Sequence, residues 1–248
     1  MTVNTRTIDE VDLDRLATME PEALLRFAFE RFGSRAAIGT SLQKSGVVLI
    51  DMASRLELPF RAFFIDTLLN PPETYDLLRE IESRYDHLHL ERFEPDAADI
   101  ESMNHCVGQY AHYLAWPNCC HVRKVLPLRR AQDTLDVWIA GLRASQSEHR
   151  RKSAAKVGIE PAHDRRPLLK LNPLFDWTDE EVDAYIRRHD VPYNRLYDYE
   201  SPYGERFFVI GCRPCHIPVR EDLGPRAGKF PWETGKKECG LHEHGDGI

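Results

Sequence analysis

Residues 36–65 read AAIGTSLQKSGVVLIDMASRLELPFRAFFI, and this stretch decides the fold class. Ala36–Thr40 is a short apolar run typical of a buried strand, and Phe60–Ile65 is a second one. Between them, Val47–Leu56 is expected to be a helix. Two buried strands joined by a helix predict a βαβ unit, whose strands lie parallel in a sheet covered by helices on both faces.

The same alternation continues on both sides of this unit. The other expected elements are a helix over 13–32 that stops at Gly33, a helix opened by Pro71–Glu73, strands at 87–90 and 137–140, and a helix from a capping box at Thr178 to about His189. The basic segment 145–166 is expected to be a mobile loop, and the chain beyond Pro192 mostly loop. We therefore expect one α/β domain over 1–226 and a flexible C-terminal segment over 227–248.

Composition limits the classes of function. The chain has 248 residues, of which 42% are hydrophobic and 29% charged, as in ordinary globular proteins. Its first residues contain no apolar signal region, and no apolar run approaches the roughly 20 residues that span a bilayer. We therefore expect a cytoplasmic protein without membrane contact. The net charge of −7 argues against extended nucleic-acid binding, which needs a positive surface.

Two cysteine pairs lie far apart in the chain. Cys119 and Cys120 are adjacent, whereas Cys212 and Cys215 form a Cys-x-x-Cys. In a reducing compartment such pairs favour a metal centre or catalysis over disulfides. An iron–sulfur cluster accommodates adjacent cysteines more easily than one tetrahedral zinc ion, but zinc, a redox dithiol and plain buried cysteines stay open. A helix beginning at Cys120 would add a favourable dipole for anionic thiolates.

Single cysteines also occur. Cys239 stands in a charged segment beside glycine, with Lys236 and Lys237 before it and His242 after it. Nearby positive charge lowers a thiol pKa and makes the thiolate a better nucleophile, so Cys239 is the candidate nucleophile. The alternative is an inert exposed cysteine. Cys106 matches no motif and is assigned no role.

Short motifs in a fixed order carry a family resemblance. They are CCHVRKV at 119–125, GLR at 141–143 followed by Gln146 and Ser147, NPLFDWT at 172–178, HDVPYN at 189–194, GCRPC at 211–215, RAGK at 226–229 and ECGLH at 238–242. Together they resemble the assimilatory adenylyl-sulfate and phosphoadenylyl-sulfate reductases over about 36–242. The resemblance implies an adenine nucleotide α-hydrolase-like (PP-loop) fold. Possession of both cysteine pairs resembles the iron–sulfur branch, which implies a 4Fe–4S cluster on Cys119, Cys120, Cys212 and Cys215.

The resemblance also implies the reaction. Adenosine 5′-phosphosulfate would be reduced to sulfite and AMP through an S-sulfonated Cys239, and thioredoxin or a similar dithiol would release the sulfite. Arg143, Arg226 and Lys229 would bind the anionic substrate, Lys124 would lie between substrate and cluster, and His242 would close over the site. The competing interpretation of each of these residues is a solvated surface charge.

The nucleotide end departs from the family pattern. The stretch Thr40–Gly46 has its glycine displaced toward the helix, yet Ser41, Lys44 and Ser45 could hold a phosphate; the alternative is a plain helix N-cap. After the second strand, Asp-Thr-Gly is replaced by Asp66-Thr67-Leu68, and Asp66 is expected to contact the ribose or the loop. These departures leave two alternatives: a phosphoadenylyl-sulfate reductase, or a non-catalytic nucleotide-binding metal–cysteine protein. A homo-oligomer is compatible with the sequence.

Overall fold

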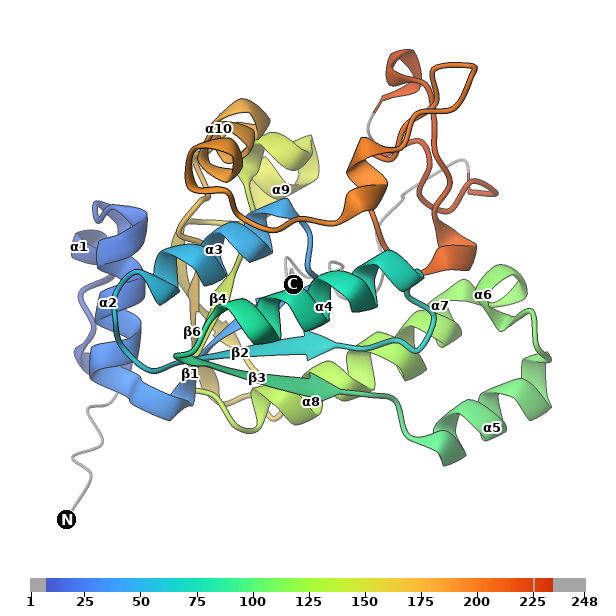
Figure 1. Cartoon of the computed structure of the whole chain (residues 1–248). Helices are drawn as coiled ribbons and strands as arrows, with labels where there is room; N and C mark the ends of the chain where they lie inside the picture. The colour runs from blue at the N-terminus through green and yellow to red at the C-terminus, as the bar shows by residue number, and fades with distance from the viewer. Residues whose placement is uncertain (1–7, 225, 234–248) are drawn as a thin grey trace.

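A single sheet forms the centre of the computed structural model, which describes residues 8–224 and 226–233. Its strands are β1 (Ala36–Thr40), β2 (Phe60–Ile65), β3 (Leu88–Phe93), β4 (Val137–Ala140), β5 (Val157–Pro161) and β6 (Pro167–Leu171). Their order is β3-β2-β1-β4-β6-β5, and all neighbours are parallel except β5 and β6 (Figure 1). The mostly parallel sheet confirms the expected fold class.

The sequence analysis did not predict the strands β5 and β6. The segment 145–166 is not simply a loop, because it contains α9 (Glu148–Ser153) and strand β5. β5 pairs antiparallel with β6 at the edge of the sheet, and it is only partly buried. An edge strand gains its position from backbone pairing, so it does not need the apolar run by which a buried strand is recognised.

Helices cover both faces of the sheet. They are α1 (Leu13–Ala17), α2 (Pro21–Phe32), α3 (Lys44–Ser54), α4 (Pro72–Arg84), α5 (Ala97–Val107), α6 (Ala111–Leu114), α7 (Trp116–Cys120), α8 (Leu126–Gln132), α9 and α10 (Asp179–His189). α2, α3, α4 and α10 pack on one face with Ile38 and Phe64, whereas α8 packs on the other with Phe63 and Trp138. Among the described helices, none combines the length and the apolar character needed to cross a membrane.

Local sequence signals explain most helix boundaries. The expected helix over 13–32 is two helices, because Pro21 suits a first turn and begins α2. Gly33 ends α2 with φ of 54°, a left-handed value that glycine adopts readily. The capping box that opens α10 is confirmed: the Glu181 amide donates to Thr178 Oγ1, and the Thr178 amide donates to the Glu181 carboxylate.

The helix that carries Cys119 and Cys120 differs from expectation. α7 begins at Trp116, so Cys120 lies a full turn beyond the helix start rather than at it. The dipole of the first turn therefore favours an anionic Cys120 less than a helix start at that residue would. The chain then continues as a π-helix over His121–Val125 into α8. Such π segments often mark functional sites, and this one contains Lys124.

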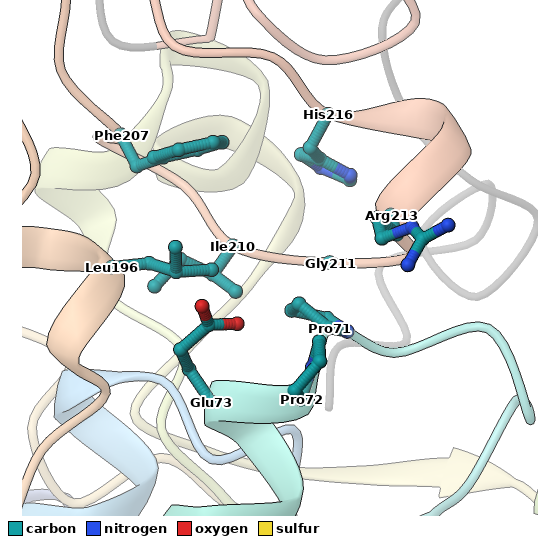
Figure 2. A pocket seen from close by; sticks show the side chains of 9 residues that line it. All are labelled: Pro71, Pro72, Glu73, Leu196, Phe207, Ile210, Gly211, Arg213 and His216. Carbon is teal, nitrogen blue, oxygen red and sulfur yellow. The ribbon is translucent and has the colours of Figure 1, made fainter. Parts of the chain in front are cut away.

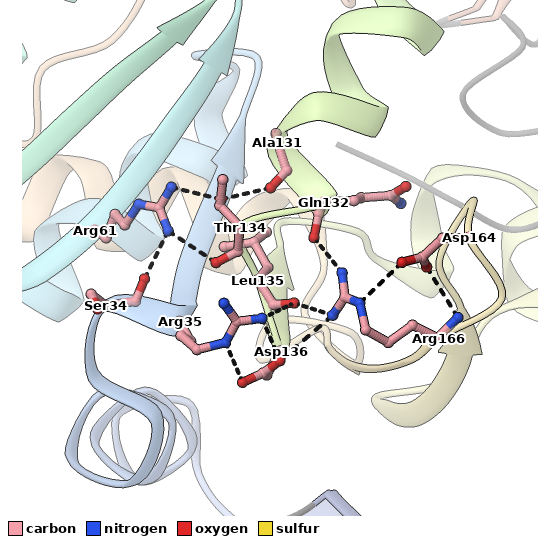
Figure 3. A network of polar contacts seen from close by, with 10 residues as sticks. All are labelled: Ser34, Arg35, Arg61, Ala131, Gln132, Thr134, Leu135, Asp136, Asp164 and Arg166. Atoms are coloured by element: carbon pink, nitrogen blue, oxygen red, sulfur yellow. Dashed lines mark hydrogen bonds and ion pairs between the residues drawn. The ribbon is translucent and has the colours of Figure 1, made fainter. Parts of the chain in front are cut away.

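Arginines fasten the edge of the sheet at which β1 and β4 begin (Figure 3). Arg35 pairs with Asp136, and Arg166 donates to the backbone carbonyl of Gln132 at 2.8 Å. Arg61 donates to Thr134 Oγ1 and to the Ser34 carbonyl, both at 2.7 Å. These contacts bind the loops at this edge to one another, so their role is to stabilise the fold. The functional side chains lie at the opposite edge.

Candidate functional site

The carboxyl ends of the parallel strands bring the nucleotide candidates to one edge of the sheet. β1 ends at Thr40, β2 is followed by Asp66, and β4 is followed by Gly141 and Arg143. β1 lies between β2 and β4, so the strand order changes direction beside it. In open α/β sheets, ligands bind at such a switch point.

The segment after β1 has an unusual backbone. Leu42 is buried at φ of 57°, and its amide donates to Thr40 Oγ1 at 2.9 Å. Gly46 allows α3 to approach this turn, because a Cβ there would lie 2.4 Å from Thr40 Oγ1. Gln43, the residue before α3, makes no side-chain capping bond. The start of α3 therefore has no side-chain cap from Gln43, and the choice between a phosphate site and a plain helix start stays a prediction.

Arg143 joins three elements from a buried position. Its side chain is 4% exposed, and Nε donates to Ser45 Oγ at 3.0 Å. The same guanidinium donates to Ser145 Oγ at 3.0 Å and to the Trp177 carbonyl at 3.2 Å, and it pairs with Asp179. These four contacts all use donors of one rigid, planar guanidinium group. Arg143 therefore fixes the start of α3 against the start of α10.

Lys44 turns toward α10. Its Nζ lies 2.7 Å from Asp183 Oδ1 and 4.8 Å from the centre of the Tyr197 ring. The ion pair is about one-third exposed on both sides, at 31% and 36%. A phosphate at the start of α3 would compete with Asp183 for this ammonium group.

Asp66 holds the loop after β2. It is buried, and its Oδ1 accepts hydrogen bonds from the Leu68 amide at 2.9 Å, Asn70 Nδ2 at 3.2 Å and the Tyr75 hydroxyl at 2.8 Å. Leu68 adopts φ of 60° at the position where the family pattern has glycine. Leu68 thus has a left-handed backbone, which is uncommon for a leucine, and it is 45% exposed.

The two cysteine pairs meet on the α8 face of the sheet. Cys119, Cys120, Cys212 and Cys215 are each 5–6% exposed. Burial raises the pKa of Cys119 and Cys215, and each of these thiols also feels the charge of Cys212. The positive charges of Arg123 and Lys124 oppose the effect of burial and lower the Cys119 pKa. Four buried thiols with cationic neighbours suit a metal group that deprotonates them, although no three His, Cys, Asp or Glu side chains of the described residues surround a single-ion position.

Arg123 is a residue that sequence reasoning missed. Its Nη1 donates to the Thr67 carbonyl at 2.8 Å, and its positive charge lowers the pKa of Cys119. Thr67 in turn lies 3.2 Å from the Cys212 sulfur. Arg123 thus connects both cysteine pairs with the loop that holds Asp66. The only signal in the sequence is its place in the motif at 119–125.

Two of the predicted substrate-binding cations, Arg226 and Lys229, act together with Lys124 on the charge of one histidine. His216 is buried, which lowers its pKa well below the usual value, and Lys229, Lys124 and Arg226 lower that pKa further by charge repulsion. Backbone pairing explains this arrangement: the Phe230 amide donates to the Cys215 carbonyl at 2.9 Å, and the Ile217 amide donates to that of Gly228 at 3.0 Å. The cations therefore lie beside the cysteine pairs. Cys239 and His242 fall outside the described residues.

Two hollows border the Cys-x-x-Cys turn. One of about 300 Å³ is formed by Pro71, Pro72, Glu73, Leu196, Phe207, Ile210, Gly211, Arg213 and His216 (Figure 2). Another of about 570 Å³ is lined by Leu68, Leu69, Asn70, Gln109, His112, Arg213 and Pro214. Neither lining includes a residue of 41–46. Glu73 and Phe207 were not among the predicted site residues.

Several known proteins are similar to this chain over most of its length. Residues 35–218 match the phosphoadenosine phosphosulfate reductase domain. The chain is 35% identical to a phosphoadenosine 5′-phosphosulfate reductase of Gloeobacter violaceus, covering 95% of each chain. It is 42% identical to an adenosine 5′-phosphosulfate reductase of Allochromatium vinosum, covering 82% of this chain and 77% of the relative.

The fold is similar to that of a solved structure. The phosphate complex of phosphoadenylyl-sulfate reductase from Candida auris has a TM-score of 0.66 at 27% identity. The match covers 88% of this chain and 99% of the other. The similarity supports the PP-loop-like fold expected from the motifs.

Proposed function

This chain belongs to the phosphoadenosine phosphosulfate reductase family, and from that premise we propose that it reduces adenosine 5′-phosphosulfate to sulfite and AMP. The observation that carries the proposal is the burial of both cysteine pairs beside the segment of Arg226 and Lys229, whose backbone pairs with that of Cys215–Ile217. The substrate is a polyanion, and fixed Lys and Arg side chains recognise its sulfate and phosphate oxygens.

The four paired cysteines would hold a 4Fe–4S cluster. Their donor set supports this: all four are thiols, all are buried, and Lys124 and Arg123 are close enough to act on Cys119. The bound cluster would supply structure and a local field, keeping Lys124 near the sulfate group. The thiols supply the two electrons of the reduction, so no electron from the cluster would be needed.

Cys239 would carry the sulfur chemistry. Its thiolate attacks the sulfate sulfur, so a bond forms between the two sulfurs and the bond from sulfur to the phosphate oxygen breaks, releasing AMP. A thiolate of thioredoxin then attacks Cys239 Sγ, and sulfite leaves with the bonding electron pair. The second thioredoxin thiol resolves the mixed disulfide, which restores Cys239 and leaves thioredoxin oxidised. His242 would close over the substrate.

The described side chains would share the binding of the nucleotide. The amides at the start of α3, with Ser41, Ser45 and Lys44, would receive the 5′-phosphate. Arg143 would keep Ser45 in place and add its charge from behind, while Arg226 and Lys229 would take the sulfate end. Asp66 would keep its loop fixed beneath the ribose.

The experiment is intact-mass analysis of the protein after incubation with adenosine 5′-phosphosulfate and, separately, with the 3′-phosphorylated form. We expect a mass increase of one SO₃ group with the first nucleotide, absent in Cys239→Ser and retained in the matched variant Cys106→Ser. A greater rate with the 3′-phosphorylated nucleotide would make the protein a phosphoadenylyl-sulfate reductase. An absent adduct with nucleotide still bound would support the non-catalytic alternative. Iron and sulfide assays on protein purified without air test the cluster separately.

A further inference from the structure

An apolar surface stands beside the cysteine pairs, on the short helix α6. Tyr110, Tyr113 and Leu114 are 59%, 53% and 66% exposed, and we call these three residues the α6 patch. Ala111, in the same turn, is 2% exposed and packs with Met103 and Cys119. The helix thus buries its smallest side chain and exposes its largest. Single exposed apolar residues are common, but three within the five residues 110–114, at α6 and the residue before it, indicate an interaction surface.

The α6 patch lies where the described chain ends. The Tyr113 ring lies 5.2 Å from that of Trp232, and Trp116 stacks on Phe230 with ring centres 4.6 Å apart. Trp116 Nε1 also donates to Glu233 Oε1 at 2.8 Å. Glu233 is therefore tied to the elements that carry the patch.

Covalent geometry limits where Cys239 can act. It follows Glu233 by six residues. An extended chain spans at most about 3.6 Å per residue, so the Cys239 backbone stays within roughly 22 Å of Glu233 whatever path it takes. A protein that attacks Cys239 therefore meets it near this end of the described chain, where Tyr113 of the α6 patch contacts Trp232.

We propose that the α6 patch is the docking surface for the dithiol protein that resolves Cys239. This inference rests on the proposed function. The patch is uncharged, and the adjoining hollow of about 570 Å³ has Arg213 as its one Lys, Arg, Asp or Glu residue. Interface cores are poor in charge and rich in aromatic side chains, so the fitting partner has an apolar rim around its reactive cysteine. An acidic group on that rim would meet Arg213.

The test compares two reductants on the full chain. The variant carries Tyr110→Ser and Leu114→Ser, both at exposed positions, and its matched control carries Tyr203→Ser and Leu223→Ser, which are 82% and 63% exposed. We expect kcat/KM for thioredoxin to fall about tenfold or more in the first variant, which corresponds to about 1.4 kcal/mol, because two buried interface anchors are lost together. Turnover with dithiothreitol, and the control variant, should match the unchanged protein.

Three other outcomes of this experiment would each have a different meaning. An unchanged kcat/KM for thioredoxin, or equal losses with both reductants, would overturn the docking surface. A change of oligomeric state in sedimentation, with thioredoxin turnover intact, would make the patch a contact between two copies of the chain and would also overturn it. Failure of Cys239 to take up SO₃ in the unchanged protein would refute the proposed function instead, because that step precedes the reductant.

Discussion

The Cys212 sulfur lies 3.2 Å from Thr67 Oγ1, and this contact joins the Cys-x-x-Cys turn to the loop after β2. Thr67 follows Asp66, whose carboxylate organises the same loop through three hydrogen bonds. The Arg213 amide adds a backbone bond of 2.7 Å to the Leu69 carbonyl. The edge of the sheet that holds the nucleotide candidates is thus bonded directly to the turn that carries Cys212 and Cys215.

Thr67→Val tests this contact. Valine keeps the shape and removes the hydroxyl, so a Cys212 thiolate loses its hydrogen-bond partner. Loss of such an outer partner typically lowers metal affinity by about 10–100-fold. We expect less iron and labile sulfide per chain after brief chelator treatment.

The matched control for that experiment is Thr74→Val, which also removes a buried hydroxyl, one that accepts from Asn194 at 3.0 Å. Equal iron retention in Thr67→Val, Thr74→Val and the unchanged protein would show that the hydroxyl does not support the metal group.

Gly46→Ala tests the close approach of α3 to β1. The added methyl group would lie 2.4 Å from Thr40 Oγ1, the atom that accepts from the Leu42 amide. We expect the free energy of unfolding to fall by about 1–3 kcal/mol, as for other overpacked sites, and AMP to bind more weakly in calorimetry. Gly158→Ala is the control, because a Cβ there meets nothing within 4 Å. Equal stability of the two variants would contradict the packing argument.

Leu68→Gly and Leu42→Gly separate backbone strain from side-chain burial. Both leucines have φ near 60°, but Leu68 is 45% exposed and Leu42 only 1%. A left-handed leucine costs roughly 1–2 kcal/mol, which glycine relieves, while its more flexible unfolded chain costs about 0.4–1 kcal/mol. We expect Leu68→Gly to leave the free energy of unfolding in urea unchanged or slightly higher, and Leu42→Gly to lower it by about 2–5 kcal/mol. Similar losses in both would show that strain is not the difference between them.

Tyr75→Phe tests the hydroxyl that donates to Asp66. Burial, together with the hydrogen bond to Asp66, raises the Tyr75 pKa to about 12 from a usual value of 10.0. Between these two values the unfolded chain loses the proton and the folded chain keeps it, so this contribution to stability is complete below pH 10 and lost as the pH rises toward 12.

The measurement is the free energy of unfolding in urea from pH 9 to 12. Tyr75→Phe should be less stable than the unchanged protein at pH 9, and the difference should shrink as the pH rises. Tyr85 and Tyr185, whose pKa values are also raised by burial, remain in both proteins and cancel in the comparison. A difference that stays constant over this range would contradict the assignment.

The sequence predicted those elements whose signals are local. The strands Ala36–Thr40, Phe60–Ile65 and Val137–Ala140 were found at their expected bounds, because buried parallel strands are continuous apolar runs. Thr178 also caps the start of α10 and Gly33 ends α2, as their residue types indicated. The prediction failed at β5, an edge strand, and at β6, whose short apolar run contains the buried Lys170. It also failed over 97–132, where short helices replace long periodic segments.

The candidate site shows the same division. The sequence marked Arg143, Lys44 and Asp66, but it could not predict that Arg143 contacts Ser45, that Lys44 pairs with Asp183, or that Tyr75 bonds Asp66. It also passed over Arg123. Such contacts depend on which loops lie together at one edge of the sheet.

By itself, the sequence determined the central parallel strands and the presence of two cysteine pairs, since residue type and spacing are sufficient for both. Only the tertiary structure decided that Cys212 meets Thr67, which is 145 residues away in the chain. Parallel strands direct all their carboxyl ends to one edge, where α7 brings Cys119 and Cys120 and the chain after α10 brings Cys212 and Cys215. A contact of that kind depends on the packed sheet and helices, because no pattern in the neighbouring residues encodes it.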